Sequence, residues 1–305
     1  MDNISRCWGV DFIRIQLPVF LVLIDGLSGK QQRTIARDYA SFATGANEAL
    51  NECDVICHAG RLAQPVGLPP ERFAVNNLYS PLQRRTGAGI EVTGFDFIGH
   101  FVRGGPAPIP AELSVAKEEQ LIWPSVLENF LRILLAHHVL DHGGVLLHSA
   151  GILYQDHAYL FFGRSNAGKT TLARKAAAAG ARVLSDDINL VIPQNGVYRA
   201  HKVPFTGEFG RRAENISGCG SFPLGGLALL EKAPKLTAAL LRPAEGLAGL
   251  LTGCPFVNND PEEVPALMDV LTKLLYHRPI IRLGVGRDDS FEAVISTLLR
   301  GCGNV

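Results

Sequence analysis

Short apolar runs separated by turn residues occupy the first third of the chain. Val10 to Ile15 and Val19 to Ile24 read as strands, and Gly87 to Ile98 alternates between apolar and polar positions as a half-buried strand does. Thr34 to Leu50 predicts a helix that Gly45 interrupts. This region carries no catalytic motif. We therefore expect a small α+β domain at the N-terminus.

A glycine- and proline-rich stretch follows from Gly104 to Pro110. Its three prolines disfavour regular structure, which makes it the best candidate for a linker. The sequence thus predicts two domains. Residues 1–111 would form an accessory or acceptor-recognition domain, and residues 112–305 a catalytic domain.

The pattern after this stretch alternates helices and strands. Ser125 to Leu140 has apolar residues at three- and four-residue spacing, as an amphipathic helix does. Val145 to Tyr154 and Ala158 to Phe162 predict two strands, separated by a polar turn. An alanine-rich helix from Thr170 to Ala179 and a strand from Ala181 to Ile192 follow. Strand, loop, helix and strand in this order are typical of a nucleotide-binding α/β unit.

Composition agrees with two folded domains. The chain has 305 residues, of which 47% are hydrophobic and 19% charged, enough to bury a substantial core. Its 29 basic and 29 acidic side chains give a formal net charge of zero. This balance disfavours a globally basic nucleic-acid binder.

Nothing in the sequence predicts a membrane segment or a secretion signal. The longest apolar stretch near the start, Leu17 to Ile24, has eight residues, whereas a membrane helix needs about twenty. Residues 1–6 lack the apolar core of a signal peptide. The six cysteines are scattered, so reduced thiols and a cytoplasmic location are expected, with no membrane insertion.

The residues from 163 to 170 match the phosphate-binding P-loop pattern G-x-x-x-x-G-K-[ST]. Glycines allow the backbone to direct successive N–H groups at an anion, and the following helix adds its positive end. Lys169 would reach the β- and γ-phosphates of ATP, and the Thr170 hydroxyl would bind Mg²⁺. The predicted nucleotide-binding residues are Gly163, Arg164, Ser165, Asn166, Ala167, Gly168, Lys169, Thr170 and Thr171.

Two adjacent carboxylates, Asp186 and Asp187, stand 17 and 18 residues after Lys169 at the end of an apolar run. Neighbours in a strand point to opposite faces, so one could bind Mg²⁺ while the other accepts a proton from a hydroxyl. The alternative is a strand-end turn in which Asp186 caps the backbone. His148 lies in another apolar run, and its residue pattern alone favours a buried core histidine.

The run from Val145 to Val191 resembles the catalytic domain of HPr kinase/phosphorylase, a P-loop-containing fold similar to that of PEP carboxykinase. It looks closer still to HPr-kinase-related proteins of peptide-modification and secretion gene clusters, which include serine kinases. The segments that carry the resemblance are Leu-Leu-His148-Ser-Ala, the P-loop through Thr171, Gly180 and Ser185-Asp186-Asp187. Residues 1–111 show almost none of it.

The resemblance implies a set of site residues. Asp186 and Asp187 would supply the proton acceptor and a magnesium contact, with Asp187 joining Thr170 and Glu208 as metal residues. His148 would sit near the transferred phosphate. Thr171 stands where the family has an acidic residue, and neither the family's glycine-rich signature stretch nor its basic phosphorylase loop is evident. These departures count against phosphorolysis and against HPr itself as the substrate.

Three functions remain open on the sequence. The leading hypothesis is an ATP- and Mg²⁺-dependent kinase that phosphorylates a hydroxyl, most simply a serine of a small protein or peptide. A small-molecule alcohol kinase on the same scaffold is the second. A nucleotide-gated regulatory protein without transfer activity is the third. No nucleic-acid partner is expected, and because similar proteins often assemble, a homo-oligomer is left open.

Overall fold

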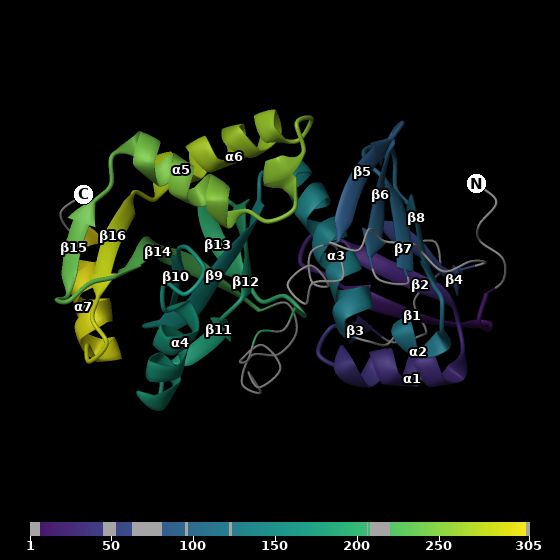
Figure 1. Ribbon diagram of the computed structural model, residues 1–305, viewed down its shortest axis with the longest axis horizontal. Coiled ribbons are helices and arrows are strands. Elements are labelled where there is room, and N and C mark those ends of the chain that lie inside the picture. Colours follow the sequence, from purple (N-terminus) through teal and green to yellow (C-terminus); the bar gives the residue numbers. More distant parts are fainter. Residues whose placement is uncertain are drawn as a thin grey trace, which may run out of the picture. The chain divides into compact units, whose positions relative to one another are not determined.

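The computed structural model is a mixed α/β protein with two large sheets (Figure 1). It describes residues 7–44, 53–62, 81–94, 97–121, 124–205, 207 and 220–302. The chain divides into two compact units, Met1–His138 and Val139–Val305. Within the described parts, no helix is both long and apolar enough to cross a membrane.

The sheet of the first unit has the strand order β3-β1-β2-β4-β8-β7-β6-β5. Its strands are β1 (Asp11–Gln16), β2 (Leu21–Leu27), β3 (Ala43–Thr44), β4 (Val55–Arg61), β5 (Leu82–Thr86), β6 (Gly89–Gly94), β7 (Phe97–Val102) and β8 (Ile109–Val115). The pairings β2–β4 and β4–β8 are parallel and the others antiparallel. The strands predicted at Val10–Ile15 and Val19–Ile24 are confirmed as β1 and β2. The alternating stretch Gly87–Ile98 contains β6 and the start of β7.

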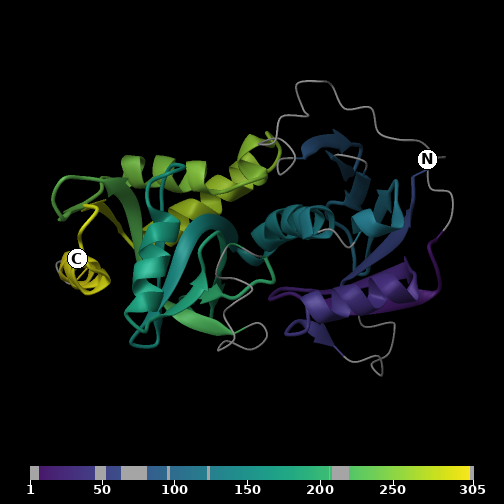
Figure 2. The same cartoon turned by 60° about the horizontal axis from the view of Figure 1, so that its bottom comes forward.

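Helices α1 (Gly29–Asp38), α2 (Glu118–Leu121) and α3 (Pro124–His138) complete this unit. α1 packs along β1 and β2 (Figure 2). It begins at Ser28, whose side chain accepts a hydrogen bond from the Gln31 N–H while Gln31 caps the Ser28 N–H in return. The helix predicted from Thr34 to Leu50 is therefore misplaced: it starts earlier and ends at Asp38. Residues 45–50 lie outside the described residues.

The predicted linker is a connection within one sheet. Residues 103–108 join β7 to β8, which are antiparallel neighbours, and the strand β8 starts at Ile109. Pro110 is tolerated because the ladder with β7 begins only at Ala111. Since β8 pairs with both β4 and β7, it belongs to the first unit, and the boundary lies between His138 and Val139 rather than between residues 111 and 112.

The second unit contains the strands and helices that surround the predicted motif. They are η4 (Val139–His142), β9 (Val145–Tyr154), β10 (His157–Phe162), α4 (Lys169–Ala178), β11 (Arg182–Ser185), β12 (Ile188–Gln194), β13 (Val197–His201), β14 (Ser221–Lys232), β15 (Thr237–Leu240), α5 (Pro243–Gly253), η5 (Val257–Asn259), α6 (Val264–His277), β16 (Ile280–Val285) and α7 (Phe291–Cys302). The predictions for β9, β10 and α4 are confirmed to within a residue. The strand predicted from Ala181 to Ile192 is broken in two by Asp186 and Asp187.

Two long strands organise the sheet of this unit. The first part of β9 pairs with β12, and its second part with β10 and β11. β14 likewise pairs first with β13 and then runs parallel to both β10 and β16. β10 and β14 therefore end side by side, and the end of β10 leads into the predicted P-loop.

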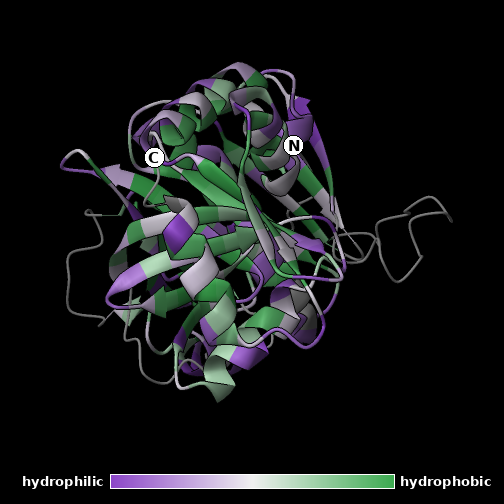
Figure 3. Ribbon diagram, turned by 90° about the vertical axis from the view of Figure 1, so that its left-hand side faces the viewer, coloured by the Kyte–Doolittle hydropathy of each residue, from purple (hydrophilic) through white to green (hydrophobic). Residues whose placement is uncertain are grey.

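Helices cover both faces of this sheet (Figure 1). On one face, α4 and α7 bury a cluster that includes Phe161, Leu172, Leu230, Val294 and Leu298. On the other face, Gly249 of α5 approaches Phe162, and α5 and α6 pack on each other. Hydrophobic residues accordingly run along the strands between the helices (Figure 3). This three-layer arrangement holds the loop after β10 at the edge of a rigid core.

Candidate functional site

The segment that connects β10 to α4 is a tight loop, residues 163–170, called the glycine loop below. Gly163 has a φ of 154°, and a Cβ there would lie 2.6 Å from the Leu230 carbonyl oxygen, so only glycine fits. Asn166 and Gly168 have φ values of 63° and 108°. Asparagine tolerates this left-handed conformation better than most residues. The strand, loop and helix that the motif requires are all present.

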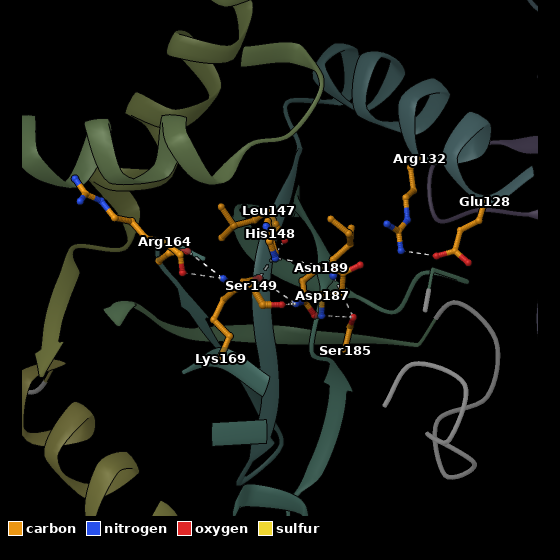
Figure 4. A network of polar contacts seen from close by, with 12 residues as sticks. Glu128, Arg132, Leu147, His148, Ser149, Arg164, Lys169, Ser185, Asp187 and Asn189 are labelled. Atoms are coloured by element: carbon orange, nitrogen blue, oxygen red, sulfur yellow. Dashed lines mark hydrogen bonds and ion pairs between the residues drawn. The ribbon is translucent and has the colours of Figure 1, made fainter. Parts of the chain in front are cut away.

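Lys169 begins α4 and folds back over the glycine loop (Figure 4). Its Nζ donates to the carbonyl oxygens of Gly163, at 3.0 Å, and Arg164, at 3.3 Å. Only 7% of the residue is exposed. This burial lowers the pKa of Lys169 below its usual value, and the nearby carboxylate of Asp187 opposes the shift. The Arg164 side chain points away from the other labelled residues in Figure 4.

The two predicted carboxylates lie where the chain turns from β11 to β12. Ser185 makes this turn, because its Oγ accepts hydrogen bonds from the N–H groups of Asp187 and Ile188, each at 3.2 Å. The Asp187 carbonyl oxygen accepts a hydrogen bond from the Ser149 N–H on β9 at 2.9 Å. Asp186 is buried and Asp187 half-buried. The turn thus gives the two carboxylates different surroundings.

His148 lies on β9 opposite Ile188, next to this turn. Its Nε2 is 3.5 Å from Oδ1 of Asp187 (Figure 4). The His148 side chain is 47% exposed, so the core interpretation that its apolar neighbours favoured is wrong. The side chain faces the space beside the carboxylate turn instead.

A cavity of about 570 Å³ brings most of the predicted residues together. Its lining residues are His148, Ser165, Asn166, Gly168, Lys169, Thr170, Thr171, Asp186, Asp187, Gly207 and Lys232. Gly163, Arg164 and Ala167, the other predicted loop residues, line a neighbouring cavity on the outer side of the glycine loop, as Ser165 and Asn166 also do. Glu208 lies outside the described residues.

Two lining residues were missed from the sequence. A Cβ on Gly207 would lie 2.1 Å from Oδ1 of Asp186, so a side chain there would displace that carboxylate. Lys232 ends β14 and is exposed, and its ammonium has no hydrogen bond or ion pair to any residue that the structure describes. Lys232 gave no local signal, because it reaches the cavity only through the pairing of β14 with β10.

The oxygen atoms at the cavity suit a magnesium ion. Thr170 offers a hydroxyl, and Asp186 and Asp187 offer carboxylates, in a cavity that also contains Lys169. Hydroxyl and carboxylate oxygens, together with those of a phosphate, are the ligands that Mg²⁺ prefers. The residues therefore fit a magnesium–phosphate group, with Thr170 and one carboxylate as protein ligands.

Comparison with known proteins adds a family match over this region. Residues 110–255 match the family described as SynChlorMet cassette protein ScmC. Among solved structures, the chain is similar to the Hpr(Ser) kinase/phosphatase from Coxiella burnetii, with 12% sequence identity and a TM-score of 0.32. That match covers 51% of this chain and 88% of the other chain. No curated protein matches the chain. The stretch that matches the family contains all the lining residues of the cavity that the structure describes.

Proposed function

We propose that the second unit is an HPr-kinase-like P-loop domain, and that the protein is an ATP- and Mg²⁺-dependent kinase. The acceptor is a hydroxyl, the serine of a small protein or peptide. The observation that carries this proposal is the shared cavity. Lys169 and Thr170 of the glycine loop line it together with two carboxylates and His148, which supports the proposal. Phosphate-binding and proton-accepting groups then face the same reacting atoms.

The loop residues would bind the substrate ATP. Backbone N–H groups at the start of α4 and the glycine loop point toward an anion in such loops, and the helix end adds a partial positive charge. Lys169 would exchange its two carbonyl contacts for phosphate oxygens, since an ammonium binds an anion more strongly than a neutral acceptor. Bound Mg²⁺ supplies charge neutralisation at the phosphates.

The carboxylate turn would handle the acceptor. The serine oxygen attacks the γ-phosphorus, the bond between the γ-phosphorus and the bridging oxygen breaks, and ADP leaves. One of Asp186 and Asp187 takes the hydroxyl proton, and the other holds Mg²⁺. His148, 3.5 Å from Asp187, is placed to orient that carboxylate and to approach the transferred group.

The choice of a protein or peptide serine draws on sequence. The residues from Val145 to Val191 resemble those of HPr kinase/phosphorylase and its relatives in peptide-modification clusters. The first unit carries no catalytic motif, which suits a role in acceptor recognition, where contacts remote from the reacting atoms position the hydroxyl.

The test is phosphoryl transfer from γ-labelled ATP with Mg²⁺ to proteins and peptides encoded beside the gene, followed by mapping of the labelled residue. A labelled serine in one acceptor, absent with Lys169→Ala, is the expected result. Label on added glycerol or sugars instead would support a small-molecule kinase. ATP binding without label on any acceptor would support a regulatory protein.

A further inference from the structure

A second cavity adjoins the candidate site at the first turn of α4. It measures about 590 Å³ and is bounded by α4, the end of β14 and the segment after β16. Gly168, Thr171 and Lys232 line both cavities, whereas His148, Asp186 and Asp187 line only the first. A molecule that lies across Thr171 would therefore have one end beside the carboxylates and the other in the second cavity.

The floor and walls of this second cavity are apolar. Leu172 of α4 and Leu230 of β14 are each 2% exposed and form part of the core beneath it. Ala167, Ala233, Pro234 and Val285 are further apolar residues of the lining. Flat apolar groups bind in cavities of this kind and of this volume, which lies within the range of about 300–1,000 Å³ for small-molecule sites.

The rim is cationic and is held in place. Lys175, Lys232 and Arg287 line the cavity, and none of its described lining residues carries a carboxylate. Lys175 donates to the carbonyl oxygens of Arg287, at 2.7 Å, and Asp289, at 2.6 Å, which ties the segment after β16 to α4. The Gly286 N–H donates to Asp289 Oδ2 at 2.6 Å and closes this segment further. The cavity is thus a formed feature with a positive edge.

The cavity on the outer side of the glycine loop is a competitor of similar size, about 600 Å³. Its lining combines the carboxylates of Glu231 and Glu245 with the cations Arg164 and Lys232, and both carboxylates lie 3.8 Å from Arg282. Its residues also include none of the first turn of α4. The described lining of this competitor thus has as many carboxylates as cations, whereas that of the proposed cavity has three cations and no carboxylate, which favours a phosphorylated ligand in the proposed cavity.

We propose that the nucleoside of the bound nucleotide occupies the cavity between α4, the end of β14 and the segment after β16. The base lies on Leu172, Leu230 and Val285, and Lys232 contacts the phosphate chain where the two cavities meet. This inference rests on the proposed function, because it presumes a triphosphate on the glycine loop. It adds where the nucleoside lies and which residues contact the base.

A matched pair of substitutions tests the location. Pro234 and Ala248 are both exposed, and they line the two competing cavities. Titration of ATP and of inorganic tripolyphosphate, each with Mg²⁺, separates nucleoside contacts from phosphate contacts. Pro234→Trp should weaken ATP binding about tenfold or more, a loss of about 1.4 kcal/mol or more, and leave tripolyphosphate binding unchanged. Ala248→Trp should change neither.

Photolabelling of the unmodified protein with 8-azido-ATP provides a measurement free of substitutions. Label in the peptides that contain residues 230–236 or 283–289 supports the proposal. Label in residues 243–253 overturns the proposal. A selective loss of ATP binding in Ala248→Trp also overturns it, and so does an equal loss of ATP and tripolyphosphate binding in Pro234→Trp. If the unmodified protein binds neither ATP nor tripolyphosphate, the proposed function itself fails.

Discussion

The Lys169 ammonium donates to two backbone carbonyl oxygens of the glycine loop, and Lys169→Ala tests its role. Because Nζ contacts two loop carbonyls rather than the apolar core, its loss should leave the fold intact. The interaction with the β- and γ-phosphates should be lost, and with it most of the nucleotide affinity or turnover. ATP titration together with thermal unfolding measures both. Unchanged affinity and turnover in a folded variant would contradict the assignment.

Substitution by asparagine is expected to have a different effect at each of the two carboxylates. One of Asp186→Asn and Asp187→Asn should still bind ATP yet lose transfer by about 10²- to 10⁴-fold, the range for loss of a general base. The other should mainly raise the Mg²⁺ concentration needed. Binding and transfer are measured separately for each variant over a series of Mg²⁺ concentrations. Near-full transfer by both would mean that the pair only shapes the turn.

His201, at the end of β13, should make the free energy of unfolding depend on pH. It is 4% exposed, and burial, aided by Arg199, lowers its pKa from 6.5 to about 4. The unfolded chain therefore binds more protons between these values, so this residue makes stability fall as the pH drops from about 6.5 toward 4, by at most about 1.4 kcal/mol per pH unit.

His201→Asn should therefore lose less stability than the unmodified protein between pH 7.5 and pH 5, as measured by urea unfolding. The exposed His142 offers a control, since His142→Asn should keep the original pH dependence. The same dependence in His201→Asn would show that this histidine is not held neutral in the fold.

At the scale of elements, the turn between β11 and β12 depends on a glycine distant in sequence. The approach of Gly207 to Asp186 leaves no room for a methyl group. Gly207→Ala should displace that carboxylate and reduce transfer at least about tenfold, because a shift of about 1 Å in a reacting group has large effects on rate. Gly249→Ala on α5 is the control, since its methyl group would come no closer than 3.3 Å to a neighbour. Equal activity of the two variants would contradict this placement.

The elements that the sequence predicted well are those with local signals. The core strands β9 and β10 and helix α4 have continuous apolar runs or periodicity bounded by glycines and turn residues. β8 was missed because three prolines near its start suggested a linker, although its pairing partners decide its place. α1 was misplaced although Ser28 and Gln31 stand at the spacing of a reciprocal cap, because the prediction followed the apolar pattern and overlooked this local signal.

The residues of the candidate site likewise divide into those that sequence analysis predicted and those that it missed. Its loop residues and carboxylates stand within 25 residues of one another, and the resemblance of this stretch to HPr kinase/phosphorylase predicted that they belong to one site. Lys232 and Gly207 come from elsewhere in the chain and enter the cavity only through strand order and close backbone approach. Sequence spacing carries no information about either.

At the scale of the whole molecule, the boundary after His138 predicts which fragment binds ATP without the rest of the chain. A fragment that begins at Val139 should bind ATP within about threefold of the full chain, because the described lining of both cavities lies in this unit. It should lose most phosphorylation of its protein acceptor. Titration and a transfer assay on both proteins measure this. Equal acceptor phosphorylation would place recognition wholly in the second unit.

A fragment that begins at Glu112 should be more prone to aggregate than the fragment that begins at Val139. It would retain half of β8 without the partners β4 and β7, and would leave Leu113 and Val115, both 0% exposed in the full chain, without their sheet. We expect it to aggregate, as size-exclusion chromatography would show. A monodisperse fragment from Glu112 would instead favour the boundary suggested by the prolines.

The contacts that Lys169 makes with its own loop affect how the protein responds to ionic strength. The Lys169 ammonium already donates to two carbonyl oxygens and its residue is only 7% exposed, so little of it is accessible to chloride or another small anion. With a net charge of zero, the molecule also has little long-range attraction for an anion. The capture of a polyanion should then vary only weakly between low and physiological salt, because screening acts mainly on exposed cations such as Lys232 and Arg287. Discrimination among anions would arise at contact, from which ligand can replace both carbonyls at once.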